Sequence, residues 1–340
     1  MQALILVGGE GTRLRPLTNT VPKAVMPLAG RPFLSYMIDW LARHGVDDVV
    51  LACGFGAARV REVLGEGGNP RLRYVEEPEP RGTAGAIKFC AEQLGDRFLA
   101  LNGDVLTDLD LSALIGFHRE RGSRATLGLY AVEDATGYGL VRRDDDGAVL
   151  EFLEKPAEPQ PGEINAGTYA LERSVLDLVP EGRTISIEHE VFPQMIGKGL
   201  FAIPLRGYWM DIGTPDRYLQ ATWDILERRV KTAIGERLDE AGRLIGPGVE
   251  AADGAIVQPP ALVEEGVRIG AGAAVGPRAA IGARCEIGAR ATVSGSVLHD
   301  ECVVGEAATV RDAILGAGVE VGDGAVVAPG SVIGAGESVD

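Results

Sequence analysis

The sequence predicts two architectures in one chain: an α/β fold built on a mainly parallel sheet, followed by a parallel β-helix. The first prediction rests on short apolar runs that alternate with stretches of helical periodicity, namely Ala3–Val7, Phe33–Leu41, Asp48–Ala52 and Phe98–Leu101. This βαβ rhythm is typical of a parallel sheet covered by helices. The second prediction rests on branched aliphatic residues that recur every six positions toward the end of the chain.

The six-residue repeat predicts roughly five coils, because three hexads make one turn of a β-helix. Many of its members precede glycine, which suits the corners since glycine adopts left-handed backbone angles readily. Cys285 and Cys302 each lie two positions before a member, where we expect a small inward side chain with a structural role. The members are Ile245, Ala251, Val257, Val263, Ile269, Val275, Ile281, Ile287, Val293, Leu298, Val304, Val310, Leu315, Val321, Val327 and Ile333.

Composition places the boundary between the two parts. The chain has 3 Trp, 7 Tyr and 8 Phe, and all of these aromatic residues lie at or before Trp223. No lysine follows Lys231. We therefore expect a first domain over residues 1–230, a linker over residues 231–243 and the β-helix over residues 244–340.

The charge balance excludes several classes of partner. Among 340 residues, Lys+Arg is 33 and Asp+Glu is 49, a formal net charge of −16. A chain of this sign should be repelled by nucleic acid and by anionic membranes, so we expect neither as a partner. The four cysteines have no CxxC spacing, and the N-terminus lacks the pattern of a signal peptide. We expect a reducing, cytoplasmic location.

A glycine-rich segment follows the first predicted strand, and it reads Gly8-Gly9-Glu10-Gly11-Thr12-Arg13-Leu14-Arg15-Pro16-Leu17-Thr18. Backbone N–H groups of such a segment can surround an anion, and the arginines add positive charge. The segment is neither a Walker A loop nor a dinucleotide fingerprint. Alone it could be only a tight turn, but Lys23 follows within a dozen residues. The combination favours a nucleotide phosphate.

Two aspartates are candidates for a shared Mg²⁺. Asp104 follows the strand Phe98–Leu101, at the sheet edge where ligands of open α/β folds bind. It could also be only a helix cap. Asp211 lies in an aromatic and apolar setting, where an unpaired carboxylate would be costly. Mg²⁺ takes one or two protein oxygens and completes its octahedron with phosphate and water.

The four histidines lack the spacing of a metal site or a hydrolytic triad, and we expect them at the surface or at helix ends. They are His44, His118, His189 and His299.

These motifs together resemble the sugar-1-phosphate nucleotidylyltransferase family over nearly the whole chain. The resemblance extends through Gly82-Thr83-Ala84-Gly85-Ala86, Asn102-Gly103-Asp104, Tyr138-Gly139, Phe152-Leu153-Glu154-Lys155-Pro156, Ile164-Asn165-Ala166-Gly167 and Trp209-Met210-Asp211-Ile212-Gly213. The segments from Thr184 to Pro193 and from Gly207 to Gly213 are most similar to the mannose-1-phosphate guanylyltransferases. Ala24 departs from the family's second proline and leaves Lys23 in place.

The resemblance implies a Rossmann-like nucleotidyltransferase sheet in residues 1–230 and a left-handed β-helix after it. It also implies transfer of a nucleoside monophosphate from an NTP to a sugar 1-phosphate, with release of pyrophosphate. Arg13 and Lys23 would bind the departing pyrophosphate and the nucleotide phosphates, and Asp104 and Asp211 would hold Mg²⁺. The implied nucleotide-binding residues are Leu6, Gly8, Gly9, Gly11, Thr12, Arg13, Lys23, Glu77, Gly82, Thr83 and Asp104. Those for the sugar phosphate are Gly139, Glu154, Lys155 and Asn165.

Glu77 favours guanine as the base, and the resemblance to the mannose-1-phosphate guanylyltransferases implies GTP and mannose 1-phosphate as substrates. It lies five positions before Gly82, where related thymidylyl- and uridylyltransferases commonly have a glutamine. An ionised carboxylate only accepts hydrogen bonds, and guanine offers adjacent N1–H and N2–H₂ donors. Glu76 or Glu79 could be the inward residue instead, and a glucose-1-phosphate thymidylyl- or uridylyltransferase remains the alternative.

Two other classes are less favoured. A β-helix acyltransferase would need an inserted loop, and the repeat region has one histidine and no such loop. A catalytically silent regulatory homologue would be expected to lack Arg13, Lys23 or an aspartate, and all are present. We expect a homo-oligomer that involves the β-helix, because its flat sides and open ends stack readily on copies of themselves.

Overall fold

The computed structural model describes residues 1–66 and 68–340, with the side chain of Glu154 left out. The chain packs as two compact units, each built from two segments. Unit 1 contains Met1–Gly9 and Met37–Trp209, and unit 2 contains Glu10–Tyr36 and Met210–Asp340. In the part of the chain described, no helix is long and apolar enough to cross a membrane.

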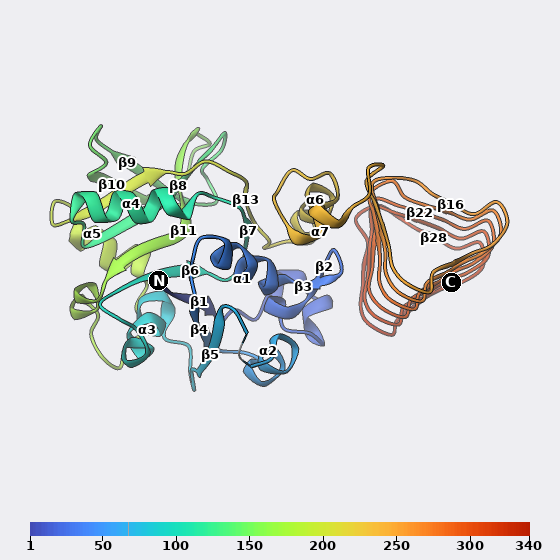
Figure 1. The fold of residues 1–340 in the computed structure, drawn as a ribbon, viewed down its shortest axis with the longest axis horizontal. Helices are drawn as coiled ribbons and strands as arrows, with labels where there is room; N and C mark the ends of the chain where they lie inside the picture. Colours follow the sequence, from blue (N-terminus) through green and yellow to red (C-terminus); the bar gives the residue numbers. More distant parts are fainter. Residues whose placement is uncertain (67) are drawn as a thin grey trace. The chain divides into compact units, whose positions relative to one another are not determined.

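Unit 1 is built on a nine-stranded sheet in which β10-β9-β11-β6-β1-β4-β5 are neighbours, with β8 between β11 and β12 (Figure 1). Strands β6, β1, β4 and β5 are parallel, which confirms the predicted βαβ rhythm, and β11 pairs antiparallel with β6. The strands are β1 (Gln2–Val7), β4 (Asp48–Cys53), β5 (Arg71–Glu76), β6 (Arg97–Asn102), β8 (Ala125–Val132), β9 (Gly139–Arg143), β10 (Val149–Glu154), β11 (Gly162–Glu172) and β12 (Leu200–Pro204).

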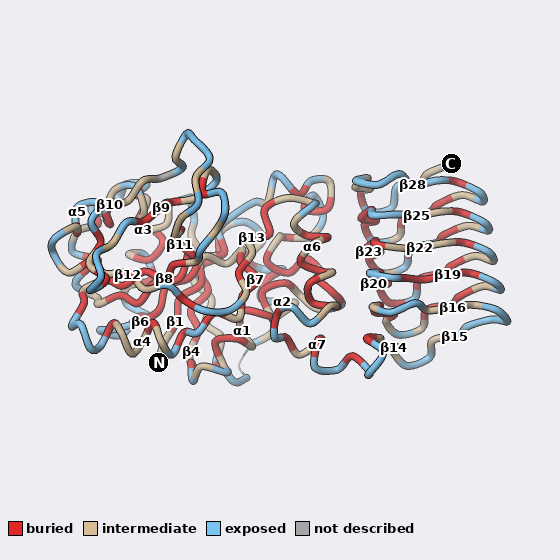
Figure 2. The backbone as a smooth tube through the Cα atoms, turned by 90° about the horizontal axis from the view of Figure 1, so that it is seen from above, coloured by how far each residue is buried: buried red, intermediate tan, exposed pale blue. Residues whose placement is uncertain are grey.

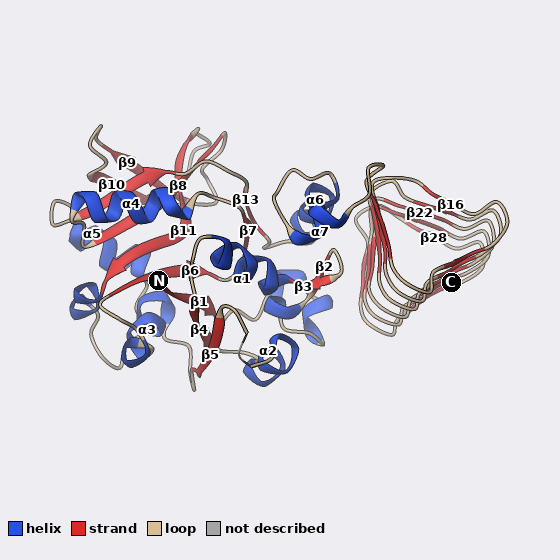
Figure 3. Cartoon of the chain, viewed as in Figure 1, coloured by secondary structure: helices blue, strands red, loops and turns tan. Residues whose placement is uncertain are grey.

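Helices cover this sheet because their apolar faces bury the branched residues of the strands (Figure 3). Helix α3 packs on β1, α4 packs on β8 and β11, and α5 packs on β10. The helices are α1 (Phe33–Arg43), which the division between units crosses, α2 (Ala57–Leu64), α3 (Gly82–Phe89), α4 (Leu111–Arg121) and α5 (Phe192–Met195). The short strand β7 (Val105–Thr107) follows β6.

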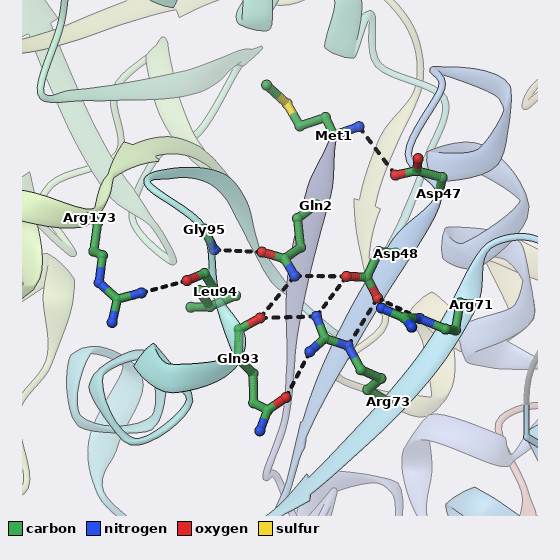
Figure 4. A network of polar contacts seen from close by, with 10 residues as sticks. All are labelled: Met1, Gln2, Asp47, Asp48, Arg71, Arg73, Gln93, Leu94, Gly95 and Arg173. Carbon is green, nitrogen blue, oxygen red and sulfur yellow. Dashed lines mark hydrogen bonds and ion pairs between the residues drawn. The ribbon is translucent and has the colours of Figure 1, made fainter.

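Polar contacts tie the strands together at the edge where β1 and β4 begin (Figure 4). The Asp48 carboxylate accepts from Gln2 Nε2 at 2.7 Å and from Arg73 Nη2 at 2.6 Å. Arg73 also donates to Gln93 Oε1 at 2.7 Å. This network links β1, β4 and β5 at their amino ends and leaves their carboxyl ends for a ligand.

Unit 2 contains the predicted parallel β-helix, whose strands form three sheets of six, six and five strands. Buried apolar residues of successive coils form one cluster, and Figure 2 shows buried stretches that recur from coil to coil. Cys285 and Cys302 are fully buried in it, as expected, and each thiol donates to a backbone carbonyl at 3.1 Å. Its corners use positive φ at Gly266 and Gly272 and also at arginines such as Arg284.

The strands of the β-helix are short. They are β14 (Arg243–Ile245), β15 (Glu250–Ala251), β16 (Ile256–Val257), β17 (Ala261–Val263), β18 (Arg268–Ile269), β19 (Ala274–Val275), β20 (Ala279–Ile281), β21 (Glu286–Ile287), β22 (Thr292–Ser294), β23 (Val297–Leu298), β24 (Val303–Val304), β25 (Thr309–Arg311), β26 (Ile314–Leu315), β27 (Glu320–Val321), β28 (Val326–Val327), β29 (Val332–Ile333) and β30 (Ser338–Val339).

One outer face of the β-helix is buried inside unit 2. On β17, β20, β23 and β26 the residues that alternate with the inward ones are apolar and buried: Leu262, Ala280, Val297 and Ile314. Unit 2 also contains helices α6 (Pro215–Leu226) and α7 (Ala233–Arg237) and the hairpin of β2 (Pro27–Leu28) and β3 (Arg31–Pro32). In α6, Trp223 Nε1 donates to the Gly295 carbonyl at 3.1 Å. A Cβ at Gly30 would lie 3.0 Å from Leu262 Cδ2, so the hairpin tip contacts the β-helix.

The expectation of surface or helix-end histidines is wrong for His299 but not for His118, which lies in the last turn of α4 although its side chain is buried. His118 is fully buried, with Nδ1 2.8 Å from Thr126 Oγ1 and Nε2 3.2 Å from Glu172 Oε1. His299 is buried in unit 2, with Nε2 3.0 Å from Tyr218 Oη. Burial lowers the pKa of His299 to about 4, so this ring is neutral at pH 7.

Candidate active site

The carboxyl end of β1 is the centre of the predicted site in unit 1. Gly103 N–H donates to the Leu6 carbonyl at 3.0 Å, and a Cβ at Gly103 would overlap that oxygen. Gly54 follows β4, and a Cβ there would lie 3.0 Å from Gly8 Cα. These two close approaches require glycine, and the one at Gly103 holds the chain just before half-buried Asp104 against the end of β1.

The segment around Gly167 packs against the residue before Gly103. Gly167 has φ +66°, and a Cβ on it would lie 2.7 Å from Asn102 Nδ2. Asn102 Oδ1 is buried and has no hydrogen-bond partner among the described residues. A buried acceptor without a partner can bind a ligand group. Asn102 lies two residues before Asp104 in the chain.

Of the three candidate base-reading glutamates, Glu77 is the half-buried one, whereas Glu76 and Glu79 are exposed. Burial raises the pKa of Glu77, and the charge and backbone N–H of Arg81 oppose that rise. Arg81 lies over the Phe89 ring at 4.6 Å and pairs with Glu79 at 3.5 Å. Glu77 is thus a carboxylate held at the end of β5, where burial strengthens its hydrogen bonds.

Gly82 and Thr83 begin helix α3, and the segment around Ile185 holds them. Gly82 has φ +70°, and a Cβ there would lie 2.5 Å from the Ile185 carbonyl oxygen. The backbone N–H groups of Ala84 and Gly85 donate to that same carbonyl at 2.9 and 3.3 Å. The Thr83 hydroxyl donates to Glu188 Oε2 at 2.7 Å.

Asn165 belongs to the same hydrogen-bonded network. Its Nδ2 donates to Tyr169 Oη at 2.8 Å, and Tyr169 Oη donates to Glu188 Oε1 at 3.0 Å. Glu188 was missed by the sequence analysis, which included it in a family-like segment without a role. Its position in that segment was the available signal, and its partners became visible only in the fold.

The other predicted sugar-phosphate residues are brought together by strand pairing. Gly139 pairs with Glu154 across β9 and β10, although the Glu154 side chain lies outside the described residues. Lys155 N–H donates to the Tyr138 carbonyl at 2.9 Å, and Lys155 has φ +50°, which is uncommon for a residue with a side chain. Leu140 pairs with Ile164, so Gly139 and Asn165 lie on neighbouring strands.

Trp209 ties this group together. Its Nε1 donates to the Ala166 carbonyl at 2.9 Å, and its ring meets the rings of Tyr138 and Tyr130 at 5.3 and 5.6 Å. Trp209 therefore contacts both the residue before β9, Tyr138, and the segment after Asn165.

In unit 2 the glycine-rich segment folds into three short 3₁₀ turns, which are η1 (Thr12–Leu14), η2 (Leu17–Asn19) and η3 (Lys23–Val25). Gly11 has φ +65°, and a Cβ on it would lie 3.0 Å from Lys23 Cβ. Thr18 Oγ1 donates to the Gly11 carbonyl at 2.9 Å. The structure thus brings the predicted residues Gly11, Thr12 and Lys23 together.

Arg13 and Asp211 also meet within unit 2. A Cβ at Gly213 would lie 2.7 Å from Arg13 Nη2 and 3.1 Å from Asp211 Oδ2. Asp211, in β13 (Trp209–Asp211), also forms an ion pair with Arg217 Nη1. Arg217 is a second residue missed in the sequence analysis, and it balances a carboxylate whose side chain is only 18% exposed.

The predicted site is therefore two groups of residues in two units. Asp104, Glu77, Thr83, Lys155 and Asn165 belong to unit 1, and the chain passes from unit 1 to unit 2 within the glycine-rich segment and again directly after Trp209. No group of three or more His, Cys, Asp or Glu able to hold a metal occurs in the described ranges. Asp104 and the buried Asn102 Oδ1 in unit 1, and separately Asp211 in unit 2, offer hard oxygen donors of the kind that Mg²⁺ prefers.

Comparisons with known proteins agree with these motifs. The Nucleotidyl transferase family model matches residues 2–228, and the EIF2B subunit epsilon LbH domain model matches residues 242–340. The mannose-1-phosphate guanylyltransferase of Mycobacterium tuberculosis is 37% identical over 268 residues, which cover 76% of this chain and 75% of that protein. The mannose-1-phosphate guanyltransferase of Candida albicans is 40% identical over 231 residues, which cover 65% of this chain and 64% of that protein.

A solved structure shares the fold of the first part. The crystal structure of HddC from Yersinia pseudotuberculosis complexed with GMP-PN has a TM-score of 0.57 and 29% sequence identity, and the match covers 65% of this chain and 97% of that chain. With its glycine-rich segment after β1, its Asp104 after β6 and these matches, the chain belongs to the nucleotidyl transferase family.

Proposed function

We propose that this chain transfers GMP from GTP to mannose 1-phosphate and so forms GDP-mannose and pyrophosphate. The observation that carries the proposal is the packing of Gly103 on the Leu6 carbonyl, which holds the chain just before Asp104 against the end of β1, where the glycine-rich segment begins. The relatives named mannose-1-phosphate guanylyltransferase support the choice of both substrates.

The reaction needs positioning and charge balance more than proton transfer. The phosphate oxygen of a sugar 1-phosphate is ionised at pH 7, so it can attack the α-phosphorus in line without a general base. In this proposal Arg13 steadies the departing pyrophosphate, Lys23 binds the nucleotide phosphates and Lys155 binds the sugar phosphate. Burial of His118 and His299 agrees with a chemistry that needs no histidine.

Asp104 and Asp211 are the proposed ligands of Mg²⁺, which would neutralise charge that develops on the phosphate oxygens. Arg13 and Arg217 lie beside Asp211, and the ion pair with Arg217 orients that carboxylate. The remaining nucleotide-binding residues are Leu6, Gly8, Gly9, Gly11, Thr12, Gly82 and Thr83, and Gly139, Glu154 and Asn165 bind the sugar.

The partial burial of Glu77 supports guanine as the base. A carboxylate accepts from the N1–H and N2–H₂ donors of guanine, whereas a pyrimidine places a carbonyl acceptor beside its N3–H. Gln at this position would therefore weaken the preference for GTP over UTP.

We also propose the domain limits of residues 1–230, 231–243 and 244–340, a cytoplasmic location, and a homo-oligomer formed through the β-helix. Ile256 and Val326 support the oligomer, because both are exposed apolar residues on the β16-β19-β22-β25-β28 sheet. They share an outward column with Ala274, Thr292 and Thr309, and Arg311 on β25 is exposed beside that column. Light scattering of the full chain at micromolar concentration tests this, and a strict monomer would refute it.

Pyrophosphate release tests the function, with GTP, ATP, UTP and dTTP each combined with mannose, glucose, galactose and glucosamine 1-phosphates. We expect GTP with mannose 1-phosphate to be the best pair, and EDTA to abolish turnover. Asp104→Asn should lose about 100-fold or more in kcat, since it removes a charged ligand of the Mg²⁺ that would neutralise the phosphate oxygens. Asp146→Asn, at an exposed position, is the matched control and should be active. A preference of more than about tenfold for UTP or dTTP would reject guanine.

A further inference from the structure

We propose that Glu188 is a positioning residue that orients the sugar-binding Asn165 and the nucleotide-binding Thr83 at the same time. This inference rests on the proposed function, because it assigns Asn165 to the sugar and Thr83 to the nucleotide. The Glu188 carboxylate accepts three hydroxyl hydrogen bonds: from Tyr169 to Oε1 at 3.0 Å, and from Thr83 and Ser186 to Oε2 at 2.7 and 2.8 Å.

The branch through Tyr169 fixes the direction of the Asn165 amide. A tyrosine hydroxyl has one proton, and Tyr169 gives it to Glu188, so its oxygen must accept from Asn165 Nδ2 at 2.8 Å. Asn165 Oδ1 then accepts from Gly167 N–H at 3.0 Å. Asn165 Nδ2 has a second hydrogen, so this order of donors sets the amide to donate to a sugar hydroxyl oxygen.

Tyr169 is fully buried, so its hydroxyl has no water with which to exchange partners. Its ring packs edge-on against Phe192 with centroids 5.0 Å apart. A buried hydroxyl with a fixed ring and a carboxylate acceptor has one favourable orientation. Through Tyr169, Glu188 therefore determines which way round the Asn165 amide lies.

The branch through Thr83 fixes the first turn of α3. Thr83 Oγ1 donates to Glu188 and accepts from Ile187 N–H at 2.8 Å. Glu188 itself lies in η6 (Ile187–Val191), a π-helical turn that begins after Ser186. Single π-helical turns are rare and occur often at functional sites. The turn places one carboxylate between two segments that bind different substrates in the proposed reaction.

A glutamine at position 188 cannot satisfy both branches. Its oxygen can accept on one side only, and its NH₂ group then faces hydroxyls that had donated to the carboxylate. Either Tyr169 reverses its proton and Asn165 turns over, or the Thr83 and Ser186 contacts weaken. The shape of the side chain is almost unchanged, so the effect is on hydrogen-bond direction rather than on packing.

The test is steady-state kinetics of Glu188→Gln, Tyr169→Phe and Thr83→Val in the full chain, with the best substrate pair found in the matrix above. We expect Tyr169→Phe to raise KM for the sugar 1-phosphate about tenfold with KM for the NTP changed less than about twofold, and Thr83→Val to do the reverse. Glu188→Gln should raise at least one of the two KM values. Adding Tyr169→Phe to Glu188→Gln should raise the sugar KM less than it does alone, because the branch is shared.

Glu190→Gln is the matched control, since Glu190 lies in the same turn and accepts only from the Ser186 backbone N–H at 3.1 Å among the contacts described for its side chain. It should leave both KM values within about twofold of wild type. The inference is overturned if Glu188→Gln leaves both KM values unchanged, or if Tyr169→Phe and Thr83→Val raise both KM values equally. If wild type prefers a different NTP or sugar, the substrate proposal fails, and the split between the two KM values still decides the role of Glu188.

Discussion

Replacing Glu264 by glutamine should stabilise the protein above neutral pH and leave its stability unchanged near pH 4. The pKa of Glu264 is raised to about 7, first by burial and then by the charges of Asp300 and Glu265, while the Ala283 backbone N–H opposes the rise. A Cβ at Gly30 would lie 2.6 Å from Glu264 Oε1, so the hairpin tip covers part of this carboxyl. The carboxyl lines a cleft between the hairpin and the strands β20 and β23.

Because the pKa of Glu264 is raised in the folded chain, its ionisation lowers the free energy of unfolding as the pH rises. Below the ordinary pKa of 4.5, Glu264 is neutral in both the folded and the unfolded chain, so its titration does not lower the free energy of unfolding. Between 4.5 and about 7 the unfolded chain ionises first, and the free energy of unfolding falls until the folded group ionises as well. The full difference corresponds to about 3 kcal/mol at about 1.4 kcal/mol per pKa unit. Solvent reaches part of the side chain, and screening reduces this to about 1–2 kcal/mol.

Calorimetry of the full chain at pH 4.5 and pH 8 measures this effect. We expect Glu264→Gln to raise the Tm of the transition that unfolds unit 2 by about 3–6 °C at pH 8 and by less than about 1 °C at pH 4.5. Glu250→Gln is the matched control, because this glutamate is exposed in the same unit. An equal gain at both pH values, or an equal gain from the control, would refute the reasoning.

Three further substitutions test other contacts. Gly103→Ala should lower kcat by more than about tenfold and cost about 1–3 kcal/mol of stability, because a Cβ would overlap the Leu6 carbonyl; kinetics and urea unfolding measure both. Asp48→Asn should flatten the loss of Tm between pH 6 and pH 3: burial raises the pKa of Asp48, but hydrogen bonds from Gln2 and Arg73 hold it below its usual value, so its stabilisation is lost as pH falls. Tyr218→Phe should cost about 1–3 kcal/mol in urea unfolding at pH 7, because it leaves buried partners without a hydrogen bond.

The β-helix could be predicted from the sequence because its repeat is local. Val263, Ile281 and Leu298 lie in register on successive strands of one sheet, so every third member of the six-residue repeat joins the same column in space. The parallel strands β1, β4 and β6 could be predicted for a similar reason, since each is one buried apolar run that ends in glycine or a polar residue.

The network around Glu188 could not be predicted in this way. Its members are separated by as many as 105 residues, and no periodic pattern joins Thr83 to Glu188. The same holds for His118 and His299, whose burial depends on partners in other strands and helices. A lone polar residue has the same appearance in a sequence whether it lies at the surface or in a satisfied core, because only the fold supplies its partners.

Unit 2 contains both the β-helix and the segment with Arg13 and Lys23, so the β-helix supports part of the proposed site. The segment that carries Arg13 and Lys23 continues into the hairpin whose tip contacts Leu262, and the Tyr218 hydroxyl donates to the Pro27 carbonyl beside His299. The cationic residues are therefore folded on the same unit as the β-helix. Removing residues 244–340 would expose the faces of α6 and of the hairpin that the β-helix buries. It follows that such a truncation should lose activity even though no β-helix residue is proposed to touch substrate.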